Sequence, residues 1–359
     1  MFVKTEPIEL AKISQEEKKV FEVLGKYYEI KFVPGSLEIF LEKTAASKVY
    51  RAEAQNLGKL VIKNSFWRNT SDSYEKAYRV SEALREKGVT IPKVYLSRDK
   101  TYFVSTDFGL MNVLEFVEGN HFTAREEEFV SAGKALGIFH RAGSEYLNKN
   151  PDERVAIDKA IPVEMSYEES RKMYPQIRKD LFGHEICAFP KVCEALKTNL
   201  SNLEKAMEFI DNSSVNSKKR ASGVIHNDFH TNNGLFRKDG SFAAFLDIDQ
   251  VGIGPFVWDL GNTLASFASN FLQGGTQEEF GKNASLFLEA YRQEFVLPEG
   301  EYKFCLAGAL RWDMMRLLRS LRRHLYENDR FPELILKIEQ RLISRIKAMP
   351  DIFSFLDRN

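Results

Sequence analysis

Residues 224–236 read Val-Ile-His-Asn-Asp-Phe-His-Thr-Asn-Asn-Gly-Leu-Phe, a polar loop between two short apolar pairs. Asp228 lies early in this loop, and Asn233 follows it five positions later. A tight turn between the two residues can aim both side chains in one direction. A carboxylate placed in this way can take the proton of a hydroxyl that comes within hydrogen-bond reach.

A second apolar stretch, Ala-Phe-Leu-Asp, ends at Asp247. Between the two stretches, Lys238-Asp239-Gly240 is typical of the tip of a β-hairpin, which would set Asn233 beside Asp247. An amide oxygen and a carboxylate are ligands suited to Mg²⁺, a hard cation that keeps phosphate oxygens in its shell. The pattern therefore predicts a magnesium site next to Asp228, the combination that phosphoryl transfer requires.

These motifs resemble those of a known family. His226-Asn227-Asp228-x4-Asn233 resembles the H-G-D-x4-N catalytic loop of the aminoglycoside phosphotransferase and choline kinase family. Asp247 resembles the metal-binding aspartate of that family, and Asp259-Leu260-Gly261, twelve residues on, resembles its Asp-Leu-Ala segment. The likeness extends over nearly the whole chain and includes Leu136-Gly137-x2-His140.

The resemblance implies an α+β, bilobal protein-kinase-like fold. Its small N-terminal lobe would hold an antiparallel sheet, and its larger C-terminal lobe would be mainly helical. The implied activity is phosphate transfer from ATP, bound in the cleft, to a hydroxyl of a small molecule. Carried onto this chain, Asp228 is the catalytic base, and Asn233 and Asp247 are the Mg²⁺ ligands.

Asn227 occupies the position where this family usually has glycine. Asparagine is among the non-glycine residues that adopt a left-handed backbone most readily. We therefore expect the shape of the loop to be kept.

The chain changes character at Gly119. Before it, the sequence predicts a helix that stops at Gly25 and then, over residues 28–117, an antiparallel sheet with one inserted helix at residues 72–87. After it, helical patterns dominate. We expect a nucleotide-binding lobe at residues 1–118 and a catalytic and acceptor-binding lobe at residues 119–359.

Candidate nucleotide-binding residues lie in the first part of the chain. Lys63 ends an apolar strand, as the strand lysine of kinases does, and would neutralise phosphate charge. Its carboxylate partner would be Glu75 or Glu82, and we favour Glu75 because it lies earlier on the helix. A solvated lysine at a strand end is the alternative interpretation.

Two further segments would contact ATP. Residues 44–48 would form the phosphate loop, which lacks glycine but offers small side chains and hydroxyls, including that of Ser47. Residues 111–119 resemble the hinge, where backbone groups of Glu115 and Val117 would hold adenine. A plain strand connection is the alternative interpretation of the phosphate loop.

The acceptor is less defined. The helical region 301–327 is basic and aromatic, with Arg311, Trp312, Asp313, Arg316, Arg319, Arg322 and Arg323. Such arginines can bind a substrate carboxylate or phosphate, but more often form salt bridges, and Trp312 with Asp313 could contact a cationic amine. An acidic pocket for an aminoglycoside could use Glu164, Glu168 and Glu169. The acceptor could be an amino sugar, an amino alcohol such as choline or homoserine, or another sugar.

Composition limits the remaining possibilities. The chain has 359 residues, 43% apolar, and 51 basic residues balance 51 acidic ones, so charge gives no argument for nucleic acid or an anionic membrane. No apolar run is long enough for a membrane span. Three cysteines without C-x-x-C spacing indicate neither disulfides nor a thiolate metal site, and we expect a cytoplasmic protein of undetermined oligomeric state.

Two other functions deserve comparison. A metal-dependent phosphohydrolase could use His226, Asp228 and His230, but it needs further ligands, and the other histidines form no second cluster. A non-catalytic, nucleotide-binding pseudokinase is the alternative outside enzymes. The intact set of Asp228, Asn233 and Asp247 favours catalysis.

Overall fold

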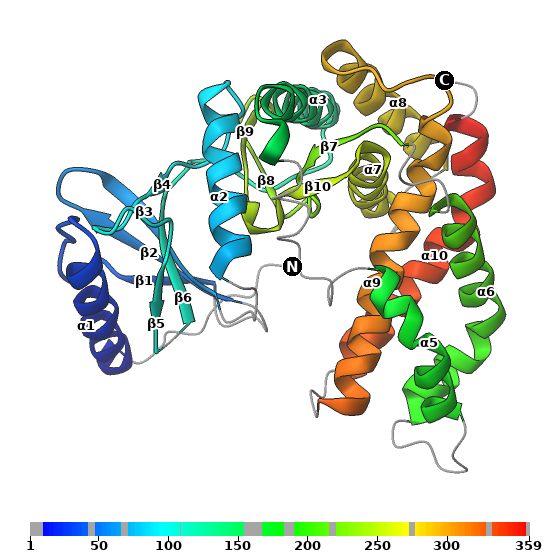
Figure 1. Cartoon of the computed structure of the whole chain (residues 1–359), viewed down its shortest axis with the longest axis horizontal. Coiled ribbons are helices and arrows are strands. Elements are labelled where there is room, and N and C mark those ends of the chain that lie inside the picture. Colours follow the sequence, from blue (N-terminus) through cyan, green and yellow to red (C-terminus); the bar gives the residue numbers. More distant parts are fainter. Residues whose placement is uncertain are drawn as a thin grey trace. The chain divides into compact units, whose positions relative to one another are not determined.

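The structure, a computed structural model, describes residues 10–41, 47–65, 71–107, 109–153, 167–182, 190–214, 220–272, 277–327 and 332–356. The chain divides into two compact units, Met1–Glu118 and Gly119–Asn359, whose elements are labelled in Figure 1. None of the helices in these ranges has both the length and the apolar character needed to cross a bilayer.

The first unit is built on an antiparallel sheet. Its strands are β1 (Glu38–Leu41), β2 (Ser47–Ala54), β3 (Gly58–Ser65), β4 (Val94–Tyr95), β5 (Val104–Thr106) and β6 (Gly109–Glu115). They follow the order β1-β2-β3-β6-β4, with β5 also paired to β6, and all pairs are antiparallel. Helix α2 (Ser71–Glu86) lies between β3 and β4 in the chain. The predicted sheet with one inserted helix is confirmed.

Alternation along the strands builds the core of this unit, because every second side chain faces the same side of a sheet. Tyr50 and Ala52 of β2 and Leu60 and Ile62 of β3 are buried, and they belong to the same cluster as Leu24 of helix α1 (Leu10–Tyr27). The expectation that this first helix stops before Gly25 is wrong. One internal glycine costs a helix only about 1 kcal/mol, and the packing of this helix on the core outweighs that cost.

The second unit is mainly helical. Its α-helices are α3 (Glu126–Lys149), α5 (Tyr167–Phe182), α6 (Pro190–Ser214), α7 (Phe256–Leu272), α8 (Gln277–Glu294), α9 (Cys305–Tyr326) and α10 (Pro332–Leu356). Two small antiparallel sheets carry the motif residues: β7 (Ser222–Ile225) pairs with β10 (Gly252–Pro255), and β8 (Gly234–Phe236) pairs with β9 (Phe242–Phe245). The described part of this unit also contains the short 3₁₀ helices η3 (Ile248–Gln250) and η4 (Tyr302–Phe304).

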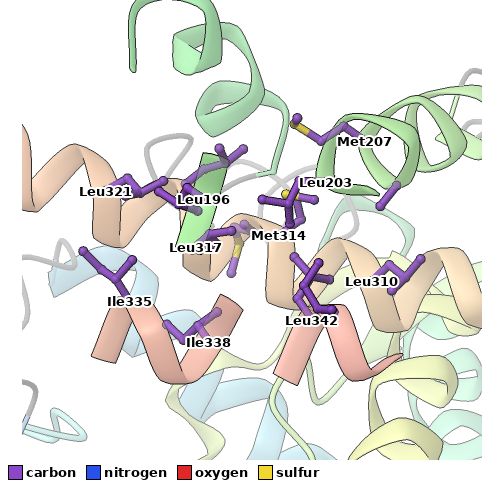
Figure 2. Close-up of a cluster of buried hydrophobic side chains, with 14 of the residues drawn as sticks. Leu196, Leu203, Met207, Leu310, Met314, Leu317, Leu321, Ile335, Ile338 and Leu342 are labelled. Carbon is purple, nitrogen blue, oxygen red and sulfur yellow. The ribbon is translucent and has the colours of Figure 1, made fainter. Parts of the chain in front are cut away.

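A large apolar cluster holds the C-terminal helices together. Figure 2 shows side chains of α6, α9 and α10 that meet in it, among them Leu203, Leu317 and Ile338. Cys193 of α6 also belongs to this cluster and is disulfide-bonded, so the expectation that the cysteines form no disulfide is wrong. Cys305 is a buried free thiol.

Helices α7 and α9 pack with their backbones in direct contact. A Cβ atom on Gly261 would lie 1.7 Å from the carbonyl oxygen of Cys305, and one on Gly308 would lie 2.6 Å from that of Val257. Only glycine permits such an approach. This contact fixes α9 against α7. The first turn of α7 holds the motif loop.

Candidate active site

The hairpin of β8 and β9 brings two of the predicted metal ligands to its open end. Gly234 is paired with Phe245, and the Leu246 amide donates to the Asn233 carbonyl over 2.8 Å. Asn233 and Asp247 therefore leave the same end of the hairpin, as the sequence predicted. Gly240, with φ +85°, forms the opposite end.

The side chain of Asn233 is oriented by Asp228. Its Nδ2 donates to the Asp228 carbonyl over 2.9 Å and to the Asp228 carboxylate over 3.2 Å. The amide oxygen consequently points away from Asp228, and no described residue donates a hydrogen bond to it. That oxygen and the exposed Asp247 carboxylate form an oxygen-only donor pair beside Asp228. Such a pair fits a hard divalent cation such as Mg²⁺.

Asp228 lies in an environment that disfavours its charge. Its side chain is only 13% exposed. Burial, followed by the negative charge of Asp247, raises the pKa of the Asp228 carboxyl well above its usual range, and Arg316 opposes this effect. A carboxylate with a raised pKa is a stronger base than an ordinary one, which suits it to take a proton from a hydroxyl.

The loop is shaped by one left-handed residue and one buried carboxylate. Asn227 has φ +67°, as expected for the position that is usually glycine. The Asp259 carboxylate accepts from the amide of His226 over 2.9 Å and from that of Asn227 over 2.8 Å. Asp259 therefore ties down the loop. Asp259 itself lies in the first turn of α7, which begins at Phe256.

A relay of buried side chains orients Asp259. His140 Nε2 lies 3.0 Å from the Asp259 carboxylate, and His140 Nδ1 lies 2.8 Å from the Tyr291 hydroxyl. Burial raises the pKa of Asp259, but its bond to His140 and the charges nearby outweigh burial, so the net pKa lies below the usual value. Sequence reasoning noted His140 only as part of a family-like segment and missed this role, because its partners lie more than a hundred positions away.

The ring of His226 is fully used inside the protein. Its Nδ1 accepts from the Asp228 amide over 3.3 Å, and its Nε2 lies 3.0 Å from the Leu246 carbonyl. The ring packs among Phe139, Phe229 and Phe245, and burial lowers its pKa. His226 therefore has a structural role in the loop.

His230 lies beside Asp228. Its Nε2 is 3.8 Å from the Asp228 carboxylate, and its Nδ1 accepts from the Asn232 amide over 3.2 Å. Burial lowers the pKa of His230 to about 4, and the nearby Arg316 acts in the same direction. The ring is consequently neutral at pH 7 and presents an N–H toward Asp228.

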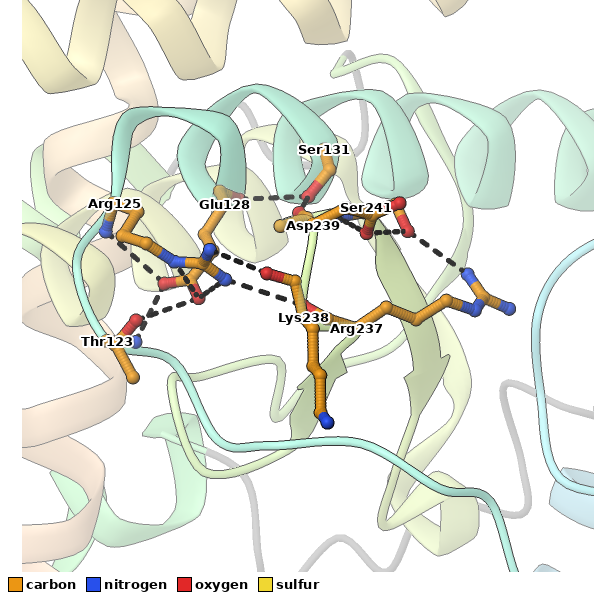
Figure 3. A network of polar contacts seen from close by, with 9 residues as sticks. Thr123, Arg125, Glu128, Ser131, Arg237, Lys238, Asp239 and Ser241 are labelled. Atoms are coloured by element: carbon orange, nitrogen blue, oxygen red, sulfur yellow. Dashed lines mark hydrogen bonds and ion pairs between the residues drawn. The ribbon is translucent and has the colours of Figure 1, made fainter.

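Helix α3 holds the far end of the hairpin. Arg125, at the start of α3, donates to the carbonyl of Lys238 over 2.9 Å and pairs with the buried Glu128 (Figure 3). Ser131 donates to the Gly240 carbonyl over 2.7 Å. The hairpin that carries Asn233 and Asp247 is thus fixed from outside the site.

Candidate nucleotide residues of the first unit lie on its strands and on α2. Lys63 is within β3, opposite Val49 and Asn112, and not at the strand end. Glu75 is half-buried on α2 and forms no ion pair with a described residue. Glu82 is held by Arg85 and by the Val94 amide. Of the two predicted partners for Lys63, Glu75 is therefore the one left available.

Ser47, Glu115 and Val117 are also in this unit. Ser47 is buried at the start of β2, and residues 44–46 of the expected phosphate loop lie outside the described ranges. The Glu115 amide donates to the Lys93 carbonyl, so that group is already used. Val117 follows the last strand, and its backbone groups bond to no described residue. Between the two, Val117 has the amide that could bind adenine.

The chain has a kinase-like fold, and the end of its hairpin gathers a buried carboxylate, an amide and a second carboxylate. These features define a class, the kinase-like phosphotransferases. Within that class, the chain belongs to the phosphotransferase enzyme family, whose sequence profile matches residues 39–295. No curated protein matches the chain in sequence.

Solved structures share the fold at low sequence identity. An amicoumacin kinase, hAmiN, in complex with AMP-PNP, Ca²⁺ and Ami, has a TM-score of 0.64 and 17% identity, over 97% of this chain and 99% of that chain. A spectinomycin phosphotransferase, APH(9)-Ia, with ADP and spectinomycin has a TM-score of 0.61 and 15% identity, over 96% and 100%. A choline kinase, LicA from Streptococcus pneumoniae, has a TM-score of 0.53 and 15% identity, over 93% and 99%. The predicted family and the protein-kinase-like α+β fold are confirmed.

Proposed function

We propose that this protein is an ATP- and Mg²⁺-dependent kinase that phosphorylates a hydroxyl of a small molecule. Membership of the phosphotransferase family supports the type of reaction. The observation that carries the proposal is the convergence of Asp228, Asn233 and Asp247, because phosphoryl transfer needs a base and charge neutralisation in one place.

Each residue of this set has a separate role. The Asp228 carboxylate accepts the proton of the acceptor hydroxyl and orients its oxygen for attack. Asn233, through its amide oxygen, and Asp247 would hold Mg²⁺, which neutralises phosphate charge when bound. His230 is neutral, so it presents an N–H group near the acceptor hydroxyl. It does not compete with Asp228 for the proton of that hydroxyl.

The first unit would bind the nucleotide. The relatives that were solved with AMP-PNP, ADP or AMP support nucleotide binding by this fold. Lys63 would neutralise the α- and β-phosphates with Glu75 as its partner, Ser47 would approach the phosphates, and the backbone of Val117, with the carbonyl of Glu115, would hold adenine. A cytoplasmic location stays a prediction from sequence.

The two alternatives have less support. A hydrolase site at His226 would need a free ring nitrogen, and both nitrogens of this ring are engaged within the protein. A pseudokinase would have no need of the buried, high-pKa carboxylate at Asp228.

The test is a screen for ATP consumption over aminoglycosides, amino alcohols and sugars, with Mg²⁺ and with the product identified by mass. We expect at least one acceptor to gain a phosphoryl group, and the Asp228→Asn variant to lose this activity. ATP hydrolysis at full rate without an acceptor would support the hydrolase. ATP binding without consumption in the whole panel would support the pseudokinase.

A further inference from the structure

Most arginines of helices α9 and α10 have acidic partners. Arg311 pairs with Glu168 over 2.9 Å and stacks on the ring of Trp258. Arg322 pairs with Glu327 over 3.0 Å. These contacts are salt bridges, the more frequent role of such arginines.

A single carboxylate, Asp313, serves two further arginines. It is fully buried, and both Arg341 and Arg345 of α10 bind it. Asp313 is therefore not available to bind a cationic amine, and Trp312 packs against the apolar cluster of this unit. Asp313, Arg341 and Arg345 together therefore carry one more positive than negative charge.

Arg316 is different. It is half-buried on α9, and it forms no hydrogen bond or ion pair with any residue in the described ranges. Asp228 attracts it and Arg341 repels it, while Asp313 is already bound to two arginines. Removing a guanidinium from water without a partner costs free energy. Its place beside the general base suggests that the missing partner is a ligand.

The described acidic residues around α5 cannot supply the opposite kind of site. Glu168 is bound by Arg311 and Glu169 by Lys172, and Glu164 lies outside the described residues. A polycationic acceptor such as an aminoglycoside would require unpaired carboxylates in this region. The charges that act on Asp228 are those of Asp247 and Asp249, which are negative, and that of Arg316, which is positive. A metal ion held by Asp247 would offset the negative charges, which leaves Arg316 to attract an anionic group of the acceptor.

We propose that Arg316 binds an anionic group of the acceptor, a carboxylate or a phosphate, while Asp228 takes the proton from a hydroxyl of the same molecule. The planar guanidinium suits both anions, because it donates two parallel hydrogen bonds. This inference rests on the proposed kinase function and names the class of its acceptor. The γ-phosphate of ATP is the other possible source of the anion, and the test separates the two.

The test measures binding by calorimetry, with Mg²⁺ and a non-hydrolysable ATP analogue present, for pairs of compounds that differ in one anionic group. Suitable pairs are homoserine with 3-aminopropan-1-ol, serine with ethanolamine, and gluconate with glucitol. We expect the carboxylate member of at least one pair to bind about ten-fold more tightly or better, the usual scale for a charge-assisted hydrogen bond.

Three variants assign this preference to its residue. Arg316→Met should abolish it, Arg316→Lys should keep part of it, and Arg322→Gln, which removes a paired arginine from the same helix, should keep all of it. Thermal unfolding of each variant checks that the fold is intact. The ratio of the affinity for the ATP analogue to the affinity for ADP should be the same in Arg316→Met as in the wild type.

Contrary results are distinct for each claim. Absence of a preference in every pair, or a preference that survives Arg316→Met, overturns the anionic acceptor. If Arg316→Met weakens only the binding of the ATP analogue, the anion at Arg316 belongs to the nucleotide. That result also overturns the anionic acceptor. If an amine without an acidic group is phosphorylated efficiently, the kinase proposal stands and only the acceptor class is wrong. If no acceptor consumes ATP, the kinase proposal itself fails.

Discussion

At the scale of single residues, the site depends on a few residues that have a left-handed backbone or a shifted pKa. Asn227 and Asp247 both have left-handed backbones, with φ of +67° and +58°. Both residue types tolerate this conformation better than most others. Asn227 directly precedes Asp228, and Asp247 is itself a predicted metal ligand, so the orientation of both carboxylates depends on these left-handed backbones.

The left-handed backbone of Asn227 can be tested by substitution. Asn227→Gly should change the free energy of unfolding by less than about 0.5 kcal/mol, because glycine adopts this φ without strain. Asn227→Ala should cost about 1 kcal/mol or more and lower turnover by displacing Asp228. Urea unfolding and kinase assays would measure both effects. Equal stability of the two variants would contradict this reasoning.

Asp228 should lower the stability of the protein in the absence of metal. Burial and the neighbouring Asp247 disfavour its charge at pH 7, and Asn has nearly the same shape without charge. Asp228→Asn should therefore raise the free energy of unfolding by about 1 kcal/mol without Mg²⁺. A variant less stable than the wild type in thermal unfolding without divalent cations would show that this carboxylate is not under strain.

At the scale of elements, local signals were predictable and distant ones were not. The hairpin followed from turn residues at 238–240, and the end of α2 from Gly88, because the information lies within a few positions. The role of Asp259 could not be read from local signals, since its partners are the backbone amides of His226 and Asn227, more than thirty positions away.

Contacts between distant elements explain what the sequence could not reveal. His140 meets Asp259 only because α3 and α7 are brought together by the fold, and no spacing rule links them. Likewise the isolation of Arg316 among arginines with acidic partners depends on the packing of α9 and α10. The residues of the motif were predictable, whereas the groups that orient them were not.

The contact of α7 with α9 gives a prediction with an internal control. Gly261→Ala should destabilise the protein by about 3 kcal/mol or more, because its Cβ would overlap the Cys305 carbonyl. Gly281→Ala, on α8, meets nothing within 4 Å and should stabilise the protein by about 0.5–1 kcal/mol. Urea unfolding would measure both. A harmless Gly261→Ala would contradict the backbone contact.

At the scale of the whole molecule, stability and pH are linked through buried carboxylates. The folded-state pKa of Asp259 is lower than its usual value. Such a group contributes stability above the pKa of the unfolded chain, about 3.9, and that contribution is lost as the pH falls through the folded pKa. Asp228, whose pKa is raised, acts in the opposite sense.

This linkage predicts a pH-dependent difference between two proteins. Asp259→Asn should be less stable than the wild type at pH 7 by about 1–3 kcal/mol, because one backbone amide loses its acceptor. As the pH falls below about 4, the difference should shrink, since the wild type then loses its own charge. Urea unfolding from pH 7 to pH 3 would measure it. A difference that stays constant would contradict the role of Asp259.

The central claim is that Asp228 takes the proton in phosphoryl transfer beside a metal held by Asn233 and Asp247. The most direct test measures turnover and nucleotide affinity together for Asp228→Asn, with an acceptor from the screen and saturating Mg²⁺. The account predicts a loss of turnover of about 10²–10⁴-fold with unchanged affinity for ATP. Turnover close to that of the wild type in a variant that still binds ATP would contradict it.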